Sequence, residues 1–313
     1  RLYAAGTNAV RAIELPGGLR GARVAWLHPL PGGAQRLLAA NGMLLAVTLD
    51  GRILAFGAEK TKPVTLADKA VPLKPAAPIV SEAKGMLAAA DATEGYALCF
   101  GVEDGALLEA LVLNSKLHLV AVDPDGAKVD QLRRRFDPAK LYGKRVTLHV
   151  GDAVTFKAPP YLANLIVVGE SAVAQLRNPV ALRAAFESLR PYGGAMWLPV
   201  TGEAAAEFLR LIDEAKLEQA KVQTADTHVL LTRAGPLPNA ADWTHQYGDI
   251  GNTVKSDDAR VRAPLGLLWF GDPGPEKMLN RHIRAAGPLC VDGRLFCQGE
   301  NVVMAFDAYN GVK

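Results

Sequence analysis

Four residues that follow or end apolar segments have the types and spacing of a ligand-binding site. Gly101 and Gly105 follow the apolar run Tyr96–Phe100 and open a helical stretch. Glycines at such positions let the backbone approach a ligand, and the free N–H groups of the next helix face outward. Asp123 and Asp152 each end a later apolar run. A carboxylate at such a strand end can accept the hydroxyls of a ribose.

The spacing of these residues disfavours a dinucleotide. A dinucleotide-binding loop has the pattern G-x-G-x-x-G, whereas here the third position is Glu103 and the sixth is Ala106. Glu103 would repel a pyrophosphate. A cofactor with a ribose and an adenine but no phosphate avoids this repulsion. Taken singly, Asp123 and Asp152 are better explained as helix caps or turn residues, but together at successive strand ends they favour a site.

The segments around these residues predict a parallel α/β sheet, because strand-like and helix-like patterns alternate between Gly57 and about Leu237. The predicted strands are Tyr96–Phe100, Leu117–Val122, Val146–Val150, Leu165–Val168 and Ala195–Leu198, the predicted helices are Ala106–Leu113, Lys128–Phe136, Val180–Leu189 and Ala204–Ala215, and Lys221–Thr232 is a closing hairpin. In such a sheet ligands bind outside the carboxyl ends of the strands.

The order of these motifs resembles that of class I S-adenosylmethionine-dependent methyltransferases. The resemblance covers roughly residues 96–233 and is carried by C-F-G-V-E-D-G from Cys99, V-D-P from Val122, V-G-D-A from Val150, N-L-I-V from Asn164 and R-P-Y-G-G-A from Arg190. It implies that Gly101 and Gly105 shape the methionine loop, that Asp123 holds the ribose hydroxyls and that Asp152 with Ala153 contacts the adenine. The cofactor-binding set that it implies is Gly101, Val102, Glu103, Gly105, Asp123, Pro124, Asp152 and Ala153.

Two departures from the family pattern concern the methionine end of this site. The family often has an acid two residues before the first glycine, where this chain has Cys99, and a middle glycine where it has Glu103. Glu103 could bind the cofactor's ammonium group itself, or its side chain could crowd the pocket. Glu170 could act as a base, but a solvated loop carboxylate is the better explanation for it. No pattern of His or Cys predicts a metal site.

A second feature of the chain is a repeat that brackets this α/β segment. Residues 1–15 and 294–308 align without a gap, with six identities in fifteen positions. Asn41–Phe56 is a weaker third copy. Each copy has apolar residues around a short Gly, Asn or Asp turn, which predicts a β-hairpin. Repeated hairpins of this kind indicate propeller blades or β-solenoids.

The flanking segments resemble bacterial PQQ-like β-propeller repeats. The resemblance rests on A-D-W-T-H-Q-Y from Ala241, P-L-G-L-L-W from Pro264 and the ending A-F-D-A-Y-N-G from Ala305, in which Asn310 replaces the family's usual threonine. Trp243 and Trp269 are expected to pack within blades. Closing a propeller takes at least four blades, so we expect the remaining blades, or another chain, to complete these repeats. We do not expect pyrroloquinoline quinone to bind this fragment.

The predicted fold is therefore mixed, with a three-layer Rossmann-like domain inserted into propeller-type repeats. The predicted parts are blade segments at 1–57, a linker at 58–79, the methyltransferase-like domain at 80–235 and further blade segments at 239–313. The predicted function is S-adenosylmethionine binding, with methyl transfer to an unknown acceptor. The alternatives are a non-catalytic scaffold whose inserted domain has lost the cofactor and a quinone-dependent dehydrogenase-like propeller.

Composition and charge limit the partners. The 313 residues carry a formal net charge of +3, and Arg133–Arg135 is the one tight basic cluster, which we interpret as a solvated helix face rather than a nucleic-acid site. No apolar run reaches the ~20 residues of a membrane span, and no targeting segment is evident. The chain starts within a repeat, so we expect a fragment. The compartment is open between bacterial cytoplasm and periplasm.

Overall fold

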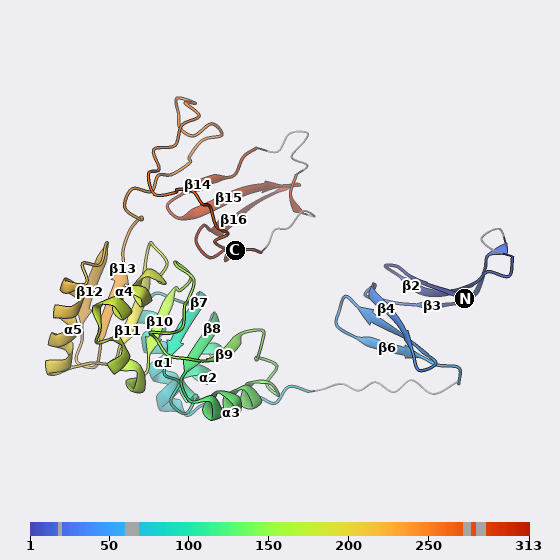
Figure 1. Ribbon diagram of the computed structural model, residues 1–313, viewed down its shortest axis with the longest axis horizontal. Coiled ribbons are helices and arrows are strands. Elements are labelled where there is room, and N and C mark those ends of the chain that lie inside the picture. Colours follow the sequence, from blue (N-terminus) through green and yellow to red (C-terminus); the bar gives the residue numbers. More distant parts are fainter. Residues whose placement is uncertain (18–20, 60–68, 272–276, 280–285) are drawn as a thin grey trace. The chain divides into compact units, whose positions relative to one another are not determined.

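The computed structural model describes residues 1–17, 21–59, 69–271, 277–279 and 286–313 (Figure 1). The chain divides into two compact units, Arg1–Asp68 and Lys69–Lys313. The second unit contains the predicted α/β domain and the C-terminal repeat.

A mixed seven-stranded sheet forms the centre of the second unit. Its strands are β7 (Glu94–Phe100), β8 (Lys116–Asp123), β9 (Val146–Val150), β10 (Leu165–Val168), β11 (Gly194–Leu198), β12 (Ala220–Thr224) and β13 (Val229–Arg233). They are ordered β12-β13-β11-β10-β7-β8-β9, and β7 to β11 are parallel whereas β13 is antiparallel to both its neighbours. All residues of β10 and β11 are buried, as expected for strands covered on both faces.

Helices cover both faces of this sheet, which gives the predicted three layers. They are α1 (Ala77–Ala89), α2 (Ala106–Leu113), α3 (Gly126–Phe136), α4 (Pro179–Glu187) and α5 (Gly202–Glu214), with a 3₁₀ helix, η2 (Glu170–Leu176), after β10. One core holds Leu111 of α2 and Phe136 of α3, and the other holds Phe186 of α4 and Phe208 of α5. The Rossmann-like fold expected from the sequence is thus present.

Two elements of this domain lie where the sequence analysis placed none. Helix α1 begins at Ala77, inside the segment 58–79 interpreted as a linker, and packs Ala83, Met86 and Leu87 into the core. The linker prediction is therefore wrong at its C-terminal end, and its residues 60–68 lie outside the described residues. The 3₁₀ helix η2 was also not predicted.

The first unit consists of two three-stranded antiparallel sheets. One contains β1 (Leu2–Ala5), β2 (Ala9–Glu14) and β3 (Arg23–Pro29), and the other contains β4 (Ala34–Ala40), β5 (Met43–Thr48) and β6 (Ile53–Phe56). A small core of Val10, Leu30, Leu44 and Ala46 joins them.

The C-terminal repeat forms a third such sheet, with β14 (Leu289–Val291), β15 (Arg294–Gly299) and β16 (Val302–Asp307). Its hairpin has the register of the first: Leu2 faces Ile13 in one, and the aligned Leu295 faces Phe306 in the other. The sequence repeat is therefore a structural repeat. No ring of blades closes within the described ranges, where the three small sheets remain open.

The residues that end the C-terminal repeat pack against the α/β domain. The Asn310 amide, 6% exposed, donates from Nδ2 to the Leu162 carbonyl and to Asn164 Oδ1, both at 3.0 Å. Arg190 forms an ion pair with Asp307 at 2.6 Å. Asn164 and Arg190 precede β10 and β11, so this contact lies at the amino ends of the strands, opposite to the predicted site.

The two tryptophans that were expected to pack within blades make packing contacts in this region. Trp269 donates from Nε1 to the Ala308 carbonyl at 2.9 Å, and its ring lies against Gly311. Trp243 pairs with Cys290 of β14 through backbone hydrogen bonds in both directions.

Candidate functional site

The glycine loop between β7 and α2 has the backbone conformation that its sequence suggests. Gly101 and Gly105 have φ angles of 72° and 81°, which favour glycine. Gly101 donates from its N–H to the Val122 carbonyl at 2.9 Å, so the loop continues the pairing of β7 with β8. A Cβ on Gly105 would lie 2.4 Å from Cδ2 of Leu132, so glycine also lets α3 pack against this loop.

Asp123 is the central carboxylate of this edge. It is 1% exposed, and its Oδ2 accepts from the Val102 N–H at 3.0 Å and from Lys128 Nζ at 2.9 Å. Its Oδ1 accepts from the N–H of Asp125 at 3.0 Å. Burial alone would raise the pKa of Asp123, but these hydrogen bonds and the Lys128 charge together lower it. The carboxylate is therefore ionised and fixed against the glycine loop.

Lys128 was not identified as a site residue from the sequence. It lies in the first turn of α3, and its side chain is 28% exposed. The hydrogen bond to Asp123 raises its pKa. Asp125 caps the same helix by accepting from the N–H groups of Ala127 and Lys128. A cap two residues after Asp123 was the sequence signal that could have placed Lys128 beside it.

Asp152 differs from Asp123, although the two look alike in the sequence. Its Oδ1 accepts from the N–H groups of Val154 and Thr155, at 2.9 and 2.7 Å, and from Thr155 Oγ1 at 2.9 Å. These bonds, those from Thr155 first, lower its pKa. Asp152 thus stabilises its own turn. The neighbouring Ala153 N–H, predicted to contact an adenine, donates to Gln175 Oε1 at 2.9 Å.

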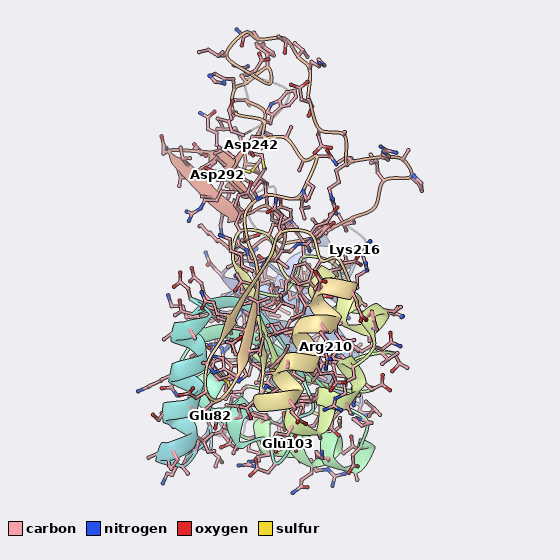
Figure 2. All side chains as sticks on the ribbon, turned by 90° about the vertical axis from the view of Figure 1, so that its left-hand side faces the viewer. Glu82, Glu103, Arg210, Lys216, Asp242 and Asp292 are labelled. Atoms are coloured by element: carbon pink, nitrogen blue, oxygen red, sulfur yellow. The ribbon has the colours of Figure 1, made fainter. Side chains whose placement is uncertain are left out.

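Glu103 connects the glycine loop to the turn after β10. Its φ is 44°, which is unusual for a residue with a side chain. Its Oε1 accepts from the Ser171 N–H at 3.1 Å and from Ser171 Oγ at 2.7 Å. Figure 2 shows Glu103 at the lower end of the α/β domain. Ser171 and Gln175 of η2, like Lys128, are site neighbours that the sequence analysis did not identify.

Two other predicted site residues, Pro124 and Glu170, are exposed. Pro124 is exposed between Asp123 and Asp125, and Glu170, the candidate base, is exposed at the start of η2. A cavity of about 330 Å³ lies between residues 153–160 and α4 and is lined in part by Phe100 and Ala153. This volume is at the low end for a small-molecule site.

The basic cluster on α3 is a solvated face that also makes hydrogen bonds to neighbouring backbone. Arg133 donates to the Leu148 carbonyl of β9, with Nη2 at 2.7 Å. Arg135 donates from Nη1 to the Asp104 carbonyl of the glycine loop at 3.0 Å and pairs with the buried Glu109. Arg134 and Arg135 are exposed and Arg133 is partly exposed, so these side chains are solvated as expected, and two of the three also bind backbone near the site.

Across the described ranges, no group of three His, Cys, Asp or Glu side chains could hold a metal ion. In the same part of the chain, no helix is long and apolar enough to cross a membrane.

Gly169 sets the distance between the end of β10 and the glycine loop. A Cβ there would lie 2.4 Å from the Gly101 carbonyl oxygen and 2.8 Å from Glu103 Oε1. Because the first contact is with backbone, we expect Gly169→Ala to lower the free energy of unfolding by about 2–3 kcal/mol. Urea denaturation measures this. Gly126→Ala in α3, where the nearest atom is 3.8 Å away, should be neutral or stabilising; equal losses for both variants would contradict the prediction.

Cys99 occupies the position where the resembled family often has an acid. It is 2% exposed, and burial raises its pKa to about 12. We therefore expect it to remain a neutral thiol and to resist alkylation at pH 8 in the folded protein, reacting only after denaturation. Mass spectrometry of iodoacetamide-treated protein would test this, with the half-buried Cys290 as the internal comparison. Alkylation of Cys99 at the rate of Cys290 would show that the strand opens.

The order of the strands defines the class of the α/β sheet. Numbered along the domain, the sheet order is 3-2-1-4-5-7-6 with the seventh strand reversed, so its first five strands have the order of a Rossmann-like sheet. No family model matches the sequence. No curated protein matches it either. The fold assignment therefore rests on this topology.

Several solved structures are similar in fold. A protein of Methanococcus maripaludis assigned as an S-adenosylmethionine-dependent methyltransferase is 19% identical over 50% of this chain and 85% of its own, with a TM-score of 0.43. A geranyl diphosphate methyltransferase in complex with S-adenosylmethionine is 10% identical over 49% and 83%, with a TM-score of 0.38. A methyltransferase of Aquifex aeolicus is 14% identical over 48% and 87%, with a TM-score of 0.38.

Proposed function

We propose that the α/β domain binds S-adenosylmethionine. The observation that carries this proposal is Asp123, an ionised carboxylate held at the carboxyl end of β8 by the N–H of Val102 in the glycine loop. A carboxylate offers about four acceptor positions. The amides of Val102 and Asp125 and the Lys128 ammonium take three of them. One ribose hydroxyl can use the fourth, and a second can displace Lys128, the partly exposed donor.

The charges at this edge favour a cofactor without phosphates. Glu103, Asp104 and Asp125 are all exposed near Asp123, and Lys128 is already paired. A pyrophosphate would meet carboxylates on the glycine loop, whereas the sulfonium and ammonium of S-adenosylmethionine would be attracted. The cofactor supplies the methyl group; Asp123 would position the ribose and the loop would position the methionine part. The acceptor is undefined, and Glu170 is the proposed base for an acceptor that holds its proton.

The flanking sheets extend this proposal to the whole chain. The two hairpins that share one register are proposed to be blade segments of a PQQ-like propeller, completed by further blades or by another chain. The α/β domain would then be an insertion between blades, joined to the last of them through Asn310 and Asp307.

Calorimetric titration tests the central proposal. We expect S-adenosylmethionine and S-adenosylhomocysteine to bind the purified chain with micromolar Kd and NAD to give no heat. If the folded protein gives no heat with either S-adenosyl compound at millimolar concentration, the proposal is wrong. Circular dichroism on the same sample establishes that the protein is folded.

A second candidate is a non-catalytic interaction domain that has lost the cofactor. It is favoured by the internal hydrogen bonds of two groups that a cofactor would need, the Ala153 N–H with Gln175 and the Glu103 carboxylate with Ser171. This candidate predicts the absence of binding in the same titration, so one experiment separates the two.

A further inference from the structure

The strand order of the sheet reverses between β7 and β10. β7 is followed in sequence by β8 on one side, whereas β10 lies on its other side. In open α/β sheets, ligands bind in the crevice outside the carboxyl ends of the strands at this point. Glu103 follows β7 and Ser171 follows β10, so the hydrogen bonds between them link the segments that leave the carboxyl ends of these two strands.

The Glu103 carboxylate is held in one orientation but is not neutralised. Both bonds from Ser171 go to Oε1, and no hydrogen bond or ion pair within the described residues occupies Oε2. The turn after β10 lies close beneath it, because a Cβ on Gly169 would be 2.8 Å from Oε1. Its charge also contributes, after Asp123, to the raised pKa of Lys128, so it acts on the same edge as Asp123.

We propose that Glu103 is a specificity-determining residue that binds the ammonium group of the amino-acid part of S-adenosylmethionine through Oε2. This inference rests on the proposed function. An ammonium has three donors and no acceptor, so an oriented carboxylate with a vacant oxygen is its natural partner. A charge-assisted hydrogen bond of this kind is roughly twice as strong as a neutral one. Cys99 cannot take this role, because it is buried and neutral.

The competing explanation is that Glu103 has only a structural role and stabilises the contact between η2 and the glycine loop. Glu103→Gln distinguishes the two, because the amide oxygen of glutamine still accepts from Ser171 while the negative charge is lost. The probes are S-adenosylmethionine, S-adenosylhomocysteine and 5′-methylthioadenosine, which keeps the adenosine and sulfur but lacks the amino-acid part. Calorimetry gives the Kd of each.

We expect Glu103→Gln to raise the Kd of the two amino-acid-bearing compounds about 10- to 100-fold and that of 5′-methylthioadenosine less than threefold. Glu82→Gln is the matched control: it removes the same charge from an exposed position on α1, and all three affinities should stay unchanged. Thermal unfolding midpoints of both variants should match that of the wild type, since the hydrogen bonds to Ser171 are kept.

Two results would overturn the inference while leaving the proposed function intact. One is equal affinity of the wild type for all three probes. The other is a Glu103→Gln variant that lowers the affinity for all three probes equally or for none of them, which would leave Glu103 with a structural role only. If the wild type binds none of the three, the proposed function itself fails, and the inference fails with it.

Discussion

Asp123→Ala is expected to abolish measurable binding of S-adenosylmethionine and to lower the free energy of unfolding by about 2–3 kcal/mol at pH 7. The substitution leaves two backbone N–H groups without an acceptor at a site that is 1% exposed, and it leaves Lys128 without its partner. The cost is smaller than for a fully buried ion pair, because the Lys128 side chain is 28% exposed and can reach water.

Urea denaturation and calorimetry measure the two effects of Asp123→Ala. The control is Asp130→Ala, also on the β8–α3 side of the domain, where the carboxylate is 55% exposed and pairs with Arg133 at 3.0 Å. An exposed pair of this kind contributes about 0–1 kcal/mol. A variant of Asp123 that still binds S-adenosylmethionine within threefold of the wild type would show that the ribose is held elsewhere.

The stability difference between wild type and Asp123→Ala should also depend on pH. The pKa of Asp123 is lowered in the folded state, so the unfolded chain binds this proton more tightly. The stabilisation by Asp123 is therefore complete above its unfolded pKa of about 3.9 and is lost as the pH falls through the lower folded value. Unfolding curves at several pH values should converge for the two proteins only in acid. A constant difference down to pH 2 would contradict this assignment.

The sheet of the α/β domain could be predicted because its strands are short apolar runs bounded by Gly, Asp and Pro. Three predicted segments, Ala106–Leu113, Val146–Val150 and Leu165–Val168, have the same bounds in the structure. Leu165–Val168 is buried throughout, as expected for a strand covered on both faces, so the chain has little choice of conformation there. The two hairpins of the repeat were predicted for a similar reason, since their turns contain Gly, Asn or Asp.

Elements held mainly by tertiary contacts could not be predicted in this way. The 3₁₀ helix η2 depends on Ser171 bonding to Glu103 and on Ala172 packing near Gly101, contacts between residues about 70 positions apart. Helix α1 follows a segment rich in Lys and Pro that reads as a linker, and it has no side-chain N-cap to mark its start. Strands β3 and β4 are exposed along most of their length, so their alternation is weak.

The same distinction applies to the site. The ends of the strands placed Asp123 and Asp152 on one edge, but the sequence did not reveal which carboxylate turns inward. Asp123 meets the N–H of Val102 across the neighbouring strand end, whereas Asp152 bonds to residues two and three positions ahead of it. Asp123 reaches the glycine loop because its strand, β8, pairs directly with β7, and this pairing could not be read from the sequence around either aspartate.

Asn310→Ala is expected to lower the free energy of unfolding of the second unit by about 2 kcal/mol. The Asn310 side chain supplies both N–H bonds that reach the Leu162 carbonyl and Asn164 Oδ1, and Asn164 also accepts from the N–H of Tyr96. Because Asn310 is 6% exposed, its removal takes a buried donor from the Leu162 carbonyl and leaves Asn164 Oδ1 with only the bond from Tyr96. Asn310→Thr restores the usual residue of the resembled repeat, but threonine is too short to span both acceptors, so we expect a similar loss.

Urea denaturation compares these variants with Gln298→Ala, a substitution at an exposed position of β15 in the same sheet. Limited proteolysis adds a second readout, since loss of the contact at the amino ends of β10 and β11 should expose the connection after Gly235 to cleavage before the α/β domain unfolds. If Asn310→Thr has the stability and cleavage rate of Gln298→Ala, Asn310 does not join the repeat to the inserted domain. If Asn310→Thr shows the expected loss, the contact of Asn310 with the α/β domain explains why this position has asparagine instead of the usual threonine of the repeat.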